Sequence, residues 1–289
     1  MNITGLSTGF AKLDEKLMGL KPGEITVIAS CPSVGKTALA MNIVECVALG
    51  QDINGDTAKS DGGKHHPALF FSLEIPAITL IGYMIASRAR IDLRKINGDD
   101  TIDGDDDMEK ERCEMNSRLV DAGDALRYAP IFIEDHESAL DVSVIRDEAR
   151  KAKSLHNIEL VVIDYLQLIE NRGIPVNSRV EELDSIVAGM KELADELGVH
   201  VILLAQIPYS MTRGVDKKLT FSDFRDILGA EQIADIDIVM FMHRLHYVNG
   251  EVNKDGEITF VNIAKNRHGE TGEVSLTFRR KCLRFFEEI

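Results

Sequence analysis

The chain has 289 residues, 44% of them apolar and 28% charged, which is typical of a globular protein with ample material for a core. Its formal net charge of −15 argues against a surface that coats nucleic acid, although a narrow channel needs only a local basic lining. No apolar run reaches the length of a bilayer span, no signal-peptide pattern opens the chain, and the four cysteines lack metal-ligand spacing, which favours reduced thiols in the cytoplasm.

Strand-like apolar runs alternate with helical patterns from residue 24 onward. The strands are expected over 24–29, 68–73, 130–134, 159–164, 199–205 and 237–242, and the helices near 36–49, 76–90, 141–156 and 178–197. This alternation predicts an α/β fold with a mostly parallel, doubly wound sheet that is covered by helices on both faces. The last runs, over 258–264, 273–278 and 283–286, predict an antiparallel meander.

The alternation is unbroken, so we expect one domain over 1–289. It would comprise an N-terminal segment (1–23), an α/β core (24–245) and a C-terminal β-meander with a hairpin (246–289). Residues 51–66 are expected to form a surface insertion. Residues 97–111 carry an aspartate run that resembles a Ca²⁺ loop, but Thr101 and Lys110 fall where acidic ligands are needed. We therefore expect a solvated loop there.

The segment Ser30-Cys31-Pro32-Ser33-Val34-Gly35-Lys36-Thr37 joins the first strand to the first helix. A buried strand, a tight loop and a helix that opens with Gly-Lys-Thr form a phosphate cradle, because loop N–H groups and the positive end of the helix dipole face the phosphates. Lys36 would reach the β- and γ-oxygens, and the Thr37 hydroxyl would bind Mg²⁺. The first motif position is Ser30 rather than Gly, which is still small. The segment predicts binding of a nucleoside triphosphate.

Three further strands end in polar side chains, and ligands bind beyond the carboxyl ends of parallel strands. Asp164 is placed to hold Mg²⁺, with turn capping as the alternative. Glu74 is a candidate to orient and deprotonate the attacking water, and capping of the helix after Pro76 is compatible with that role. Gln206 is a candidate to sense the γ-phosphate, with a plain strand-end amide as the alternative.

Several short motifs follow one another over nearly the whole chain: Thr4-Gly5-Leu6-Ser7-Thr8-Gly9-Phe10, Phe71-Ser72-Leu73-Glu74, Ile163-Asp164-Tyr165-Leu166-Gln167-Leu168, Ala205-Gln206-Ile207, Asp223-Phe224-Arg225-Asp226 and Lys265-Asn266-Arg267-His268-Gly269. Their order and joint occurrence resemble the RecA-like ATPase domain of DnaB-type replicative helicases. The phosphate loop alone would indicate only a P-loop NTPase.

The resemblance implies a hexameric ring of identical subunits that uses ATP and Mg²⁺ to translocate 5′–3′ on single-stranded DNA and to unwind duplex DNA. A primase or a helicase loader would be its partner. The resemblance assigns Lys36 and Thr37 to phosphate and Mg²⁺, Asp164 to the metal, Glu74 to water activation and Gln206 to γ-phosphate coupling.

Lys265 and Arg267 would act as trans-acting fingers, cations that reach the γ-phosphate held by the neighbouring subunit. A cation on a hairpin can neutralise charge in the transition state and so make hydrolysis depend on the subunit contact. An exposed basic hairpin tip is the alternative.

DNA contact would fall on the loop around Arg225, Asp226 and Gly229, where backbone N–H groups and one arginine per subunit would track phosphates without reading bases. The family's Ser-Gly pair in this loop is Ile227-Leu228 here. The family's N-terminal helical domain and linker helix have no counterpart before Met1, so we expect a chain without that collar.

Two other functions remain open. A RecA-type recombinase, or another DNA-dependent ATPase without unwinding activity, would share the core strands; the run from Asp164 to Leu168 and the finger hairpin favour the helicase. A regulatory module that uses ATP only for assembly would be expected to lack Glu74 or the finger residues, and both are present.

Overall fold

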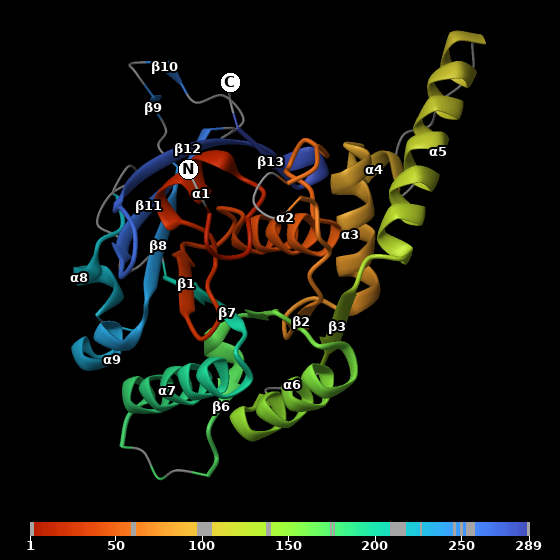
Figure 1. Ribbon diagram of the computed structural model, residues 1–289. Coiled ribbons are helices and arrows are strands. Elements are labelled where there is room, and N and C mark those ends of the chain that lie inside the picture. The colour runs from red at the N-terminus through yellow and green to blue at the C-terminus, as the bar shows by residue number, and fades with distance from the viewer. Residues whose placement is uncertain are drawn as a thin grey trace.

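A nine-stranded sheet forms the centre of the protein, with strand order β13-β12-β11-β8-β1-β7-β5-β2-β3 (Figure 1). The computed structural model describes residues 3–58, 62–96, 106–136, 140–173, 175, 177–208, 218–225, 227–244, 247–248, 251–252 and 258–287. The strands of the sheet are β1 (Ile25–Ser30), β2 (Ala68–Ser72), β3 (Ile131–Asp135), β5 (Leu160–Asp164), β7 (His200–Gln206), β8 (Ile238–His243), β11 (Ile258–Asn266), β12 (Gly272–Arg279) and β13 (Arg284–Phe286).

The part of the sheet from β8 to β3 is parallel, and β11, β12 and β13 continue it as an antiparallel meander. The side chains of β1, β2 and β5 are buried on both faces, as the continuous apolar runs of parallel strands require. The predicted fold class, the six core strands and the closing meander are therefore confirmed.

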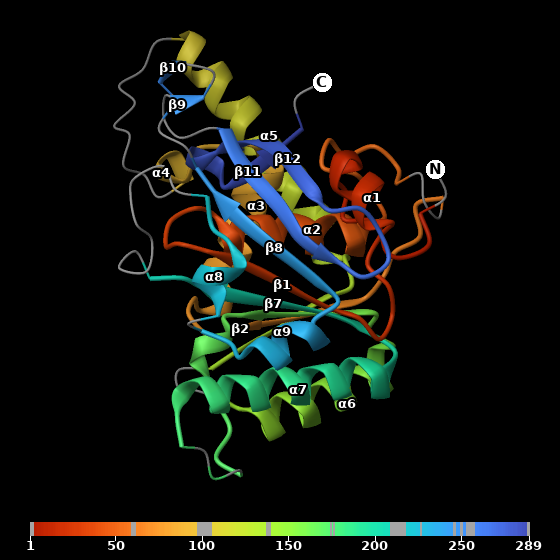
Figure 2. The same ribbon diagram turned by 90° about the vertical axis from the view of Figure 1, so that its left-hand side faces the viewer.

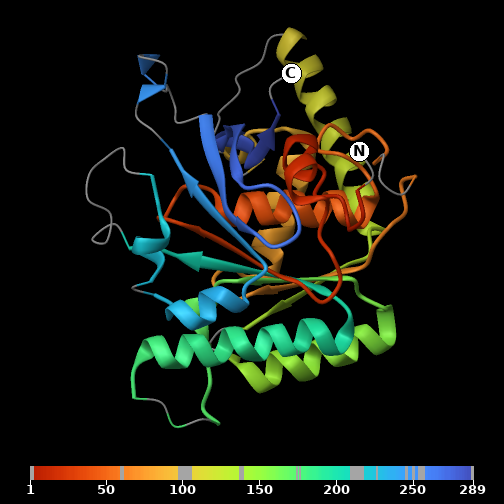
Figure 3. The same cartoon turned by 60° about the vertical axis from the view of Figure 1, so that its left-hand side comes forward.

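Helices cover both faces of the sheet (Figures 2 and 3). The helices α2 (Lys36–Leu49) and α3 (Ala77–Ala89) lie on one face, and α6 (Val142–His156) and α7 (Arg179–Leu197) lie on the other. Nearly every side chain of α2 is buried, including Asn42 and Glu45, so this helix is enclosed on all sides rather than amphipathic. Both α2 and α3 begin at the carboxyl edge of the sheet, and this places their first turns beside the strand ends expected to bind nucleotide.

Smaller elements connect and flank this core. The helices are α1 (Ala11–Leu17), α4 (Leu93–Ile96), α5 (Asp106–Arg127), α8 (Phe221–Phe224) and α9 (Ala230–Asp235), with 3₁₀ turns η1 (Leu166–Leu168) and η4 (Arg280–Cys282). Two short strand pairs join β4 (Leu140–Asp141) to β6 (Ile169–Glu170) and β9 (Tyr247–Val248) to β10 (Glu251–Val252). Within the described part of the chain, none of the helices is long and apolar enough to cross a bilayer.

The loop expected over 97–111 is only partly a loop. Helix α5 begins at Asp106 and packs against α3, so residues 106–111 are helical, whereas 97–105 lie outside the described residues. The helix was missed because it is strongly polar and packs a narrow stripe against α3, with Ala122 buried and Met115 and Leu119 partly buried. Such a sequence lacks the broad apolar periodicity that marks a helix on the core.

Candidate active site

The phosphate loop lies between the carboxyl end of β1 and the first turn of α2. Ser33 and Gly35 have positive φ angles of 60° and 108°, which turn the backbone sharply into the helix. Helix α2 has no side-chain N-cap, so the N–H groups of its first turn remain available to an anion. A Cβ on Gly35 would lie 3.2 Å from the Phe285 ring, so the loop rests directly on β13. The strand, loop and helix thus have the arrangement that the sequence predicts, and binding of phosphate by this loop stays a prediction.

Lys36 is the first residue of α2 and its side chain is buried. Burial lowers the pKa of its ammonium group, and the nearby carboxylates of Asp164 and Glu74 oppose that shift. The start of α2 and the ends of β2 and β5 thus bring one cation and two carboxylates together. The arrangement provides a positive charge for phosphate oxygens beside two groups suited to metal binding and proton transfer.

Thr37 and Asp164 meet at the centre of this site, where the Thr37 hydroxyl donates a 2.7 Å hydrogen bond to Asp164 Oδ2. Asp164 is the last residue of β5, as predicted, and its carboxylate is buried. Burial raises the pKa of Asp164 to about 6, and the charge of Glu74 adds to this effect. The Thr37 hydroxyl and the buried Asp164 carboxylate, whose negative charge Lys36 only partly offsets, are oxygen ligands that fit Mg²⁺.

We expect Asp164→Asn to stabilise the nucleotide-free chain. The folded protein binds the Asp164 proton more tightly than the unfolded chain, because the pKa is about 6 rather than 3.8, so ionisation destabilises the fold as pH rises between those values. At pH 7 the penalty is on the order of 3 kcal/mol. Asn removes it and still accepts the Thr37 hydrogen bond.

Thermal unfolding at pH 7 and pH 5 tests this prediction. The variant should melt above the wild-type chain at pH 7, by a margin that shrinks at pH 5, whereas the exposed control Asp124→Asn should change neither value. Added Mg²⁺ and nucleotide should stabilise the wild-type chain more than the variant. A variant that melts below the wild-type chain at pH 7 would contradict the assignment.

Glu74 lies just beyond β2 and is exposed at the edge of the site. The Leu73 N–H donates to the Asp164 carbonyl over 2.9 Å, which holds this turn against the end of β5. The alternative role of Glu74, helix capping, falls to another residue: the N–H of Ala77 in the first turn of α3 donates to Asp135 Oδ2 over 2.6 Å. Glu74 is therefore left accessible to a water molecule at the strand ends.

Gln206 ends β7 and pairs with Ser30 of β1, so it lies beside the start of the phosphate loop. The side-chain amide of Gln167 binds both backbone groups of Gln206. The Gln206 N–H donates to Gln167 Oε1 over 3.1 Å, and Gln167 Nε2 donates to the Gln206 carbonyl over 2.9 Å. The Gln206 side chain thus starts from a rigid backbone position.

Arg244 braces the phosphate loop and was missed by the sequence reasoning. It follows β8, and its guanidinium donates to the carbonyls of Ser33 and Val34 over 3.2 and 2.6 Å. The same group lies 4.8 Å from the centre of the Phe278 ring, which stacks on Phe285 below the loop. The rule that ligands bind beyond the carboxyl ends of parallel strands would also have pointed to Arg244, which follows β8.

Lys265 and Arg267 lie toward the amino ends of the parallel strands, whereas the phosphate loop lies at their carboxyl ends. The strand β11 is antiparallel to β8, so its end lies beside the beginning of β8. Arg267 Nη1 pairs with Asp237 Oδ1 at 2.7 Å, and Asp237 Oδ2 accepts from the N–H of Ile25, the first residue of β1. The six residues of β1, at about 3.3 Å each, separate Arg267 from the loop by roughly 20 Å. The chain does not bring the two finger residues into its own phosphate site.

The two finger residues are held by neighbours within the chain. Lys265 Nζ donates to the carbonyls of Ile233 and Ala234 over 2.9 and 2.6 Å. Burial and the charge of Arg267 lower the pKa of Lys265. These contacts hold the two finger residues against α9, which follows the expected DNA loop.

The expected DNA loop lies between α8 and α9 and is described only in part. Arg225 is exposed at the end of α8, and Asp226 lies outside the described residues. The Gly229 N–H donates to Asp184 Oδ1 over 2.8 Å, and a Cβ at Gly229 would lie 2.4 Å from the other oxygen of Asp184. The Gly229 N–H is therefore already occupied in this conformation, whereas the Arg225 side chain is open to solvent.

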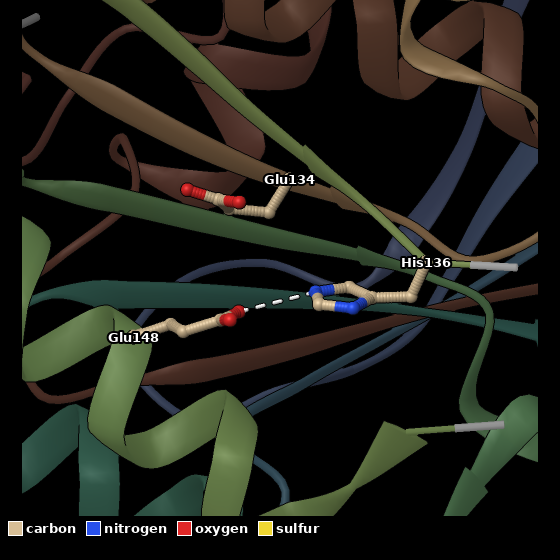
Figure 4. A group of neighbouring side chains, drawn as sticks. All are labelled: Glu134, His136 and Glu148. Atoms are coloured by element: carbon tan, nitrogen blue, oxygen red, sulfur yellow. Dashed lines mark hydrogen bonds and ion pairs between the residues drawn. The ribbon is translucent and has the colours of Figure 1, made fainter. Parts of the chain in front are cut away.

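A separate group of possible metal ligands lies at the far edge of the sheet. Glu134 of β3, His136 and Glu148 of α6 converge between strand and helix (Figure 4), with ligand atoms within 4.8 Å of one another. His136 Nε2 and Glu148 Oε2 lie 3.3 Å apart. This histidine–carboxylate contact joins the end of β3 to α6, and the phosphate site does not use these residues.

The comparisons with known proteins concern the family and fold of the chain. The family model described as DnaB-like helicase C terminal domain matches residues 5–287. The replicative DNA helicases DnaB of Pasteurella multocida and Geobacillus stearothermophilus are 35% and 34% identical to the chain, over 98% of it in each case and over 55% and 56% of their own lengths. The chain thus spans about half the length of these curated relatives.

Two solved structures share the fold. One is an ATPase domain that superposes with a TM-score of 0.82 at 29% identity, covering 100% of this chain and 93% of that one. The other, a DnaB-like replicative helicase solved in a study of its interactions with primase, gives a TM-score of 0.81 at 29% identity and covers 100% of this chain and 64% of that one. The RecA-like fold expected from the resemblance is confirmed, and the chain belongs to the DnaB-like helicase C-terminal domain family.

Proposed function

We propose that this chain is the ATP-dependent motor domain of a replicative DNA helicase, hydrolysing ATP with Mg²⁺ to translocate on single-stranded DNA and to unwind duplex DNA. The observation that carries the proposal is the meeting of Lys36, Thr37, Asp164 and Glu74 at the carboxyl edge of the sheet, joined by the 2.7 Å bond from Thr37 to Asp164. Cytoplasmic location and the division into segments 1–23, 24–245 and 246–289 are part of the same proposal.

The residues divide the chemistry among them. Loop N–H groups of Ser33, Val34 and Gly35 bind the phosphates, and Lys36 neutralises charge on the β- and γ-oxygens. Thr37 and Asp164 would hold Mg²⁺, which supplies charge neutralisation when bound. Glu74 orients the attacking water and accepts its proton, and Gln206 responds to the γ-phosphate.

The finger residues imply assembly. Since Arg267 lies roughly 20 Å from the phosphate loop of its own chain and Lys265 is close to it, we assign both to the site of a neighbour in a homo-oligomeric ring, expected to be a hexamer. Single-stranded DNA is bound through its phosphates by the loop at Arg225, Asp226 and Gly229. At Gly229 this requires the N–H to exchange Asp184 for phosphate. A primase or a helicase loader is the proposed protein partner.

Comparison of Lys36→Ala with the wild-type chain tests the nucleotide site. ATP with Mg²⁺ should raise the melting temperature of the wild-type chain, because a ligand that binds only the folded state stabilises it. The variant should lose this rise and any ATP turnover stimulated by single-stranded DNA, while its melting temperature without nucleotide stays close to that of the wild type. The exposed Lys110→Ala variant is the control. Unchanged nucleotide stabilisation in Lys36→Ala would sink the proposal.

Unwinding separates the proposed helicase from the recombinase-like alternative. Both would hydrolyse ATP in response to single-stranded DNA, but only a helicase would separate the strands of a forked duplex. A fork with a 5′ tail should be unwound and one with only a 3′ tail should not, if translocation is 5′–3′. DNA-stimulated hydrolysis without separation of either fork would favour the alternative.

A further inference from the structure

A pocket lies between the end of α3 and the residues that follow α2, away from the phosphate loop. Its volume is about 400 Å³, and four of its lining residues are arginines: Arg88 and Arg90 at the end of α3, Arg118 of α5 and Arg284 of β13. The other lining residues are Asn54, Gly55, Ala89, Asp121 and Ala122. Figure 1 shows α3, α5 and β13 grouped at one side of the molecule. A basic pocket is unexpected in a chain of net charge −15.

The carboxylates near this pocket do not balance the arginines. Glu45 is shared by Arg88 Nη1 at 3.0 Å and Arg284 Nη1 at 3.2 Å, and the lining carboxylate of Asp121 is exposed. Arg90 and Arg118 donate to backbone carbonyls of Asn54, Ala89 and Arg90, and among the described residues no carboxylate lies within ion-pair distance of either. Four guanidinium groups therefore face two carboxylates.

Two further observations show an excess of positive charge and an unpaired donor among these arginines. Burial and the charges of Arg284, Arg279 and Arg118 all lower the pKa of Arg90, so this guanidinium lies in a field of like charge. Arg284 is buried, and its Nε has no acceptor within the described structure. A buried N–H without a partner destabilises the fold unless an additional acceptor approaches.

The guanidinium groups that line the pocket indicate which class of ligand it would bind. Guanidinium groups bind phosphate oxygens through paired hydrogen bonds, and an excess of two positive charges suits a ligand with two or more phosphate charges. A volume of about 400 Å³ is within the range of small-molecule sites and too small for a folded partner. We propose that this arginine pocket binds a small phosphate-bearing anion, a diphosphate group that is either free or part of a nucleotide.

The position of the pocket separates it from the ATP site. Helix α2 begins at Lys36 and has 14 residues, so it is about 21 Å long, and Glu45 in its second half binds the lining arginines Arg88 and Arg284. Helix α3 begins just after Glu74 and ends at Ala89 and Arg90 in the pocket wall. The same two helices that open at the proposed active site thus end at the proposed anion site.

Calorimetric titration in a Lys36→Ala background tests the proposal, because that change weakens phosphate binding at the loop. Inorganic pyrophosphate is one titrant and ADP is another; tighter binding of ADP identifies a nucleotide as the source, and equal binding identifies free diphosphate. Arg118→Gln and Arg90→Gln should each lower pyrophosphate affinity about tenfold or more, the loss expected for a charge-assisted hydrogen bond. The exposed Arg112→Gln of the same helix α5 is the matched control.

Arg118 donates to the carbonyls of Ala89 and Arg90, and Arg90 donates to the carbonyl of Asn54. Glutamine removes the charge at each position and keeps an N–H donor. Thermal unfolding without ligand identifies any variant that fails to fold, and the other variant then carries the test. The proposal is overturned by the absence of pyrophosphate binding, by affinity that neither substitution changes, or by binding of a triglutamate peptide in place of pyrophosphate.

Discussion

Arg267→Ala is expected to lower ATP turnover by roughly 10³-fold or more, the lower end of the effect of a trans-acting arginine. Nucleotide affinity should change little, because the cation acts on charge that develops during hydrolysis. The geometry supports action on a neighbour: Arg267 is held by Asp237 at the amino edge of the sheet, whereas the phosphate loop lies at the carboxyl edge. Turnover should also rise more than linearly with protein concentration.

Mixing Arg267→Ala with Lys36→Ala protein is the sharpest form of this experiment. Each variant damages a different half of the shared site, so some mixed contacts regain two intact halves. The mixture should recover activity that neither variant has alone. Arg280→Ala, an exposed arginine of the same meander, is the control and should need no rescue. A mixture that demonstrably co-assembles and is still no more active than the sum of its parts would count against the trans assignment.

Glu74→Gln is expected to lower turnover per bound ATP by roughly 10²-fold or more, the contribution of a positioned general base. Glutamine keeps the size and hydrogen bonding of the side chain and loses its ability to accept the proton. Because the Glu74 charge helps to raise the pKa of Asp164, its removal makes Asp164 easier to ionise, so affinity for nucleotide with Mg²⁺ should not fall.

Single-turnover hydrolysis and nucleotide affinity, measured on the same preparation, separate the two effects. Glu114→Gln, an exposed glutamate on α5, provides the control. The role of Glu74 would be refuted by a collapse of affinity combined with normal turnover of the ATP that still binds.

The sequence was sufficient where function depends on local order along the chain. The phosphate loop, Asp164 and Gln206 each follow or end a recognisable apolar strand, so the rule that ligands bind at the carboxyl ends of parallel strands located them. The functional roles assigned to these residues, like those of Glu74, Lys265, Arg267 and the DNA loop, remain predictions.

Contacts between distant parts of the chain could not be predicted in this way. The position of Arg244 after β8 could have been picked out by the same rule, but its contact with the carbonyl of Val34, 210 positions away, is encoded in neither local sequence. The pairing of Asp237 with Arg267 likewise depends on how the meander returns along β8. The arginine pocket was invisible for the same reason, since its walls come from α3, α5, β13 and the residues after α2.

The phosphate loop and Arg267 lie at opposite ends of the parallel strands, and this determines how many complete sites an assembly can have. A contact in which each subunit offers one edge and accepts the other is heterologous, and it closes only if the rotation between neighbours completes a circle. A closed ring then has as many complete sites as subunits. An open spiral always has one fewer, since the phosphate loop at one end and the cations at the other face solvent. ATP turnover per subunit would therefore be higher in a closed ring than in an open assembly of the same size. The difference would be largest for assemblies of few subunits.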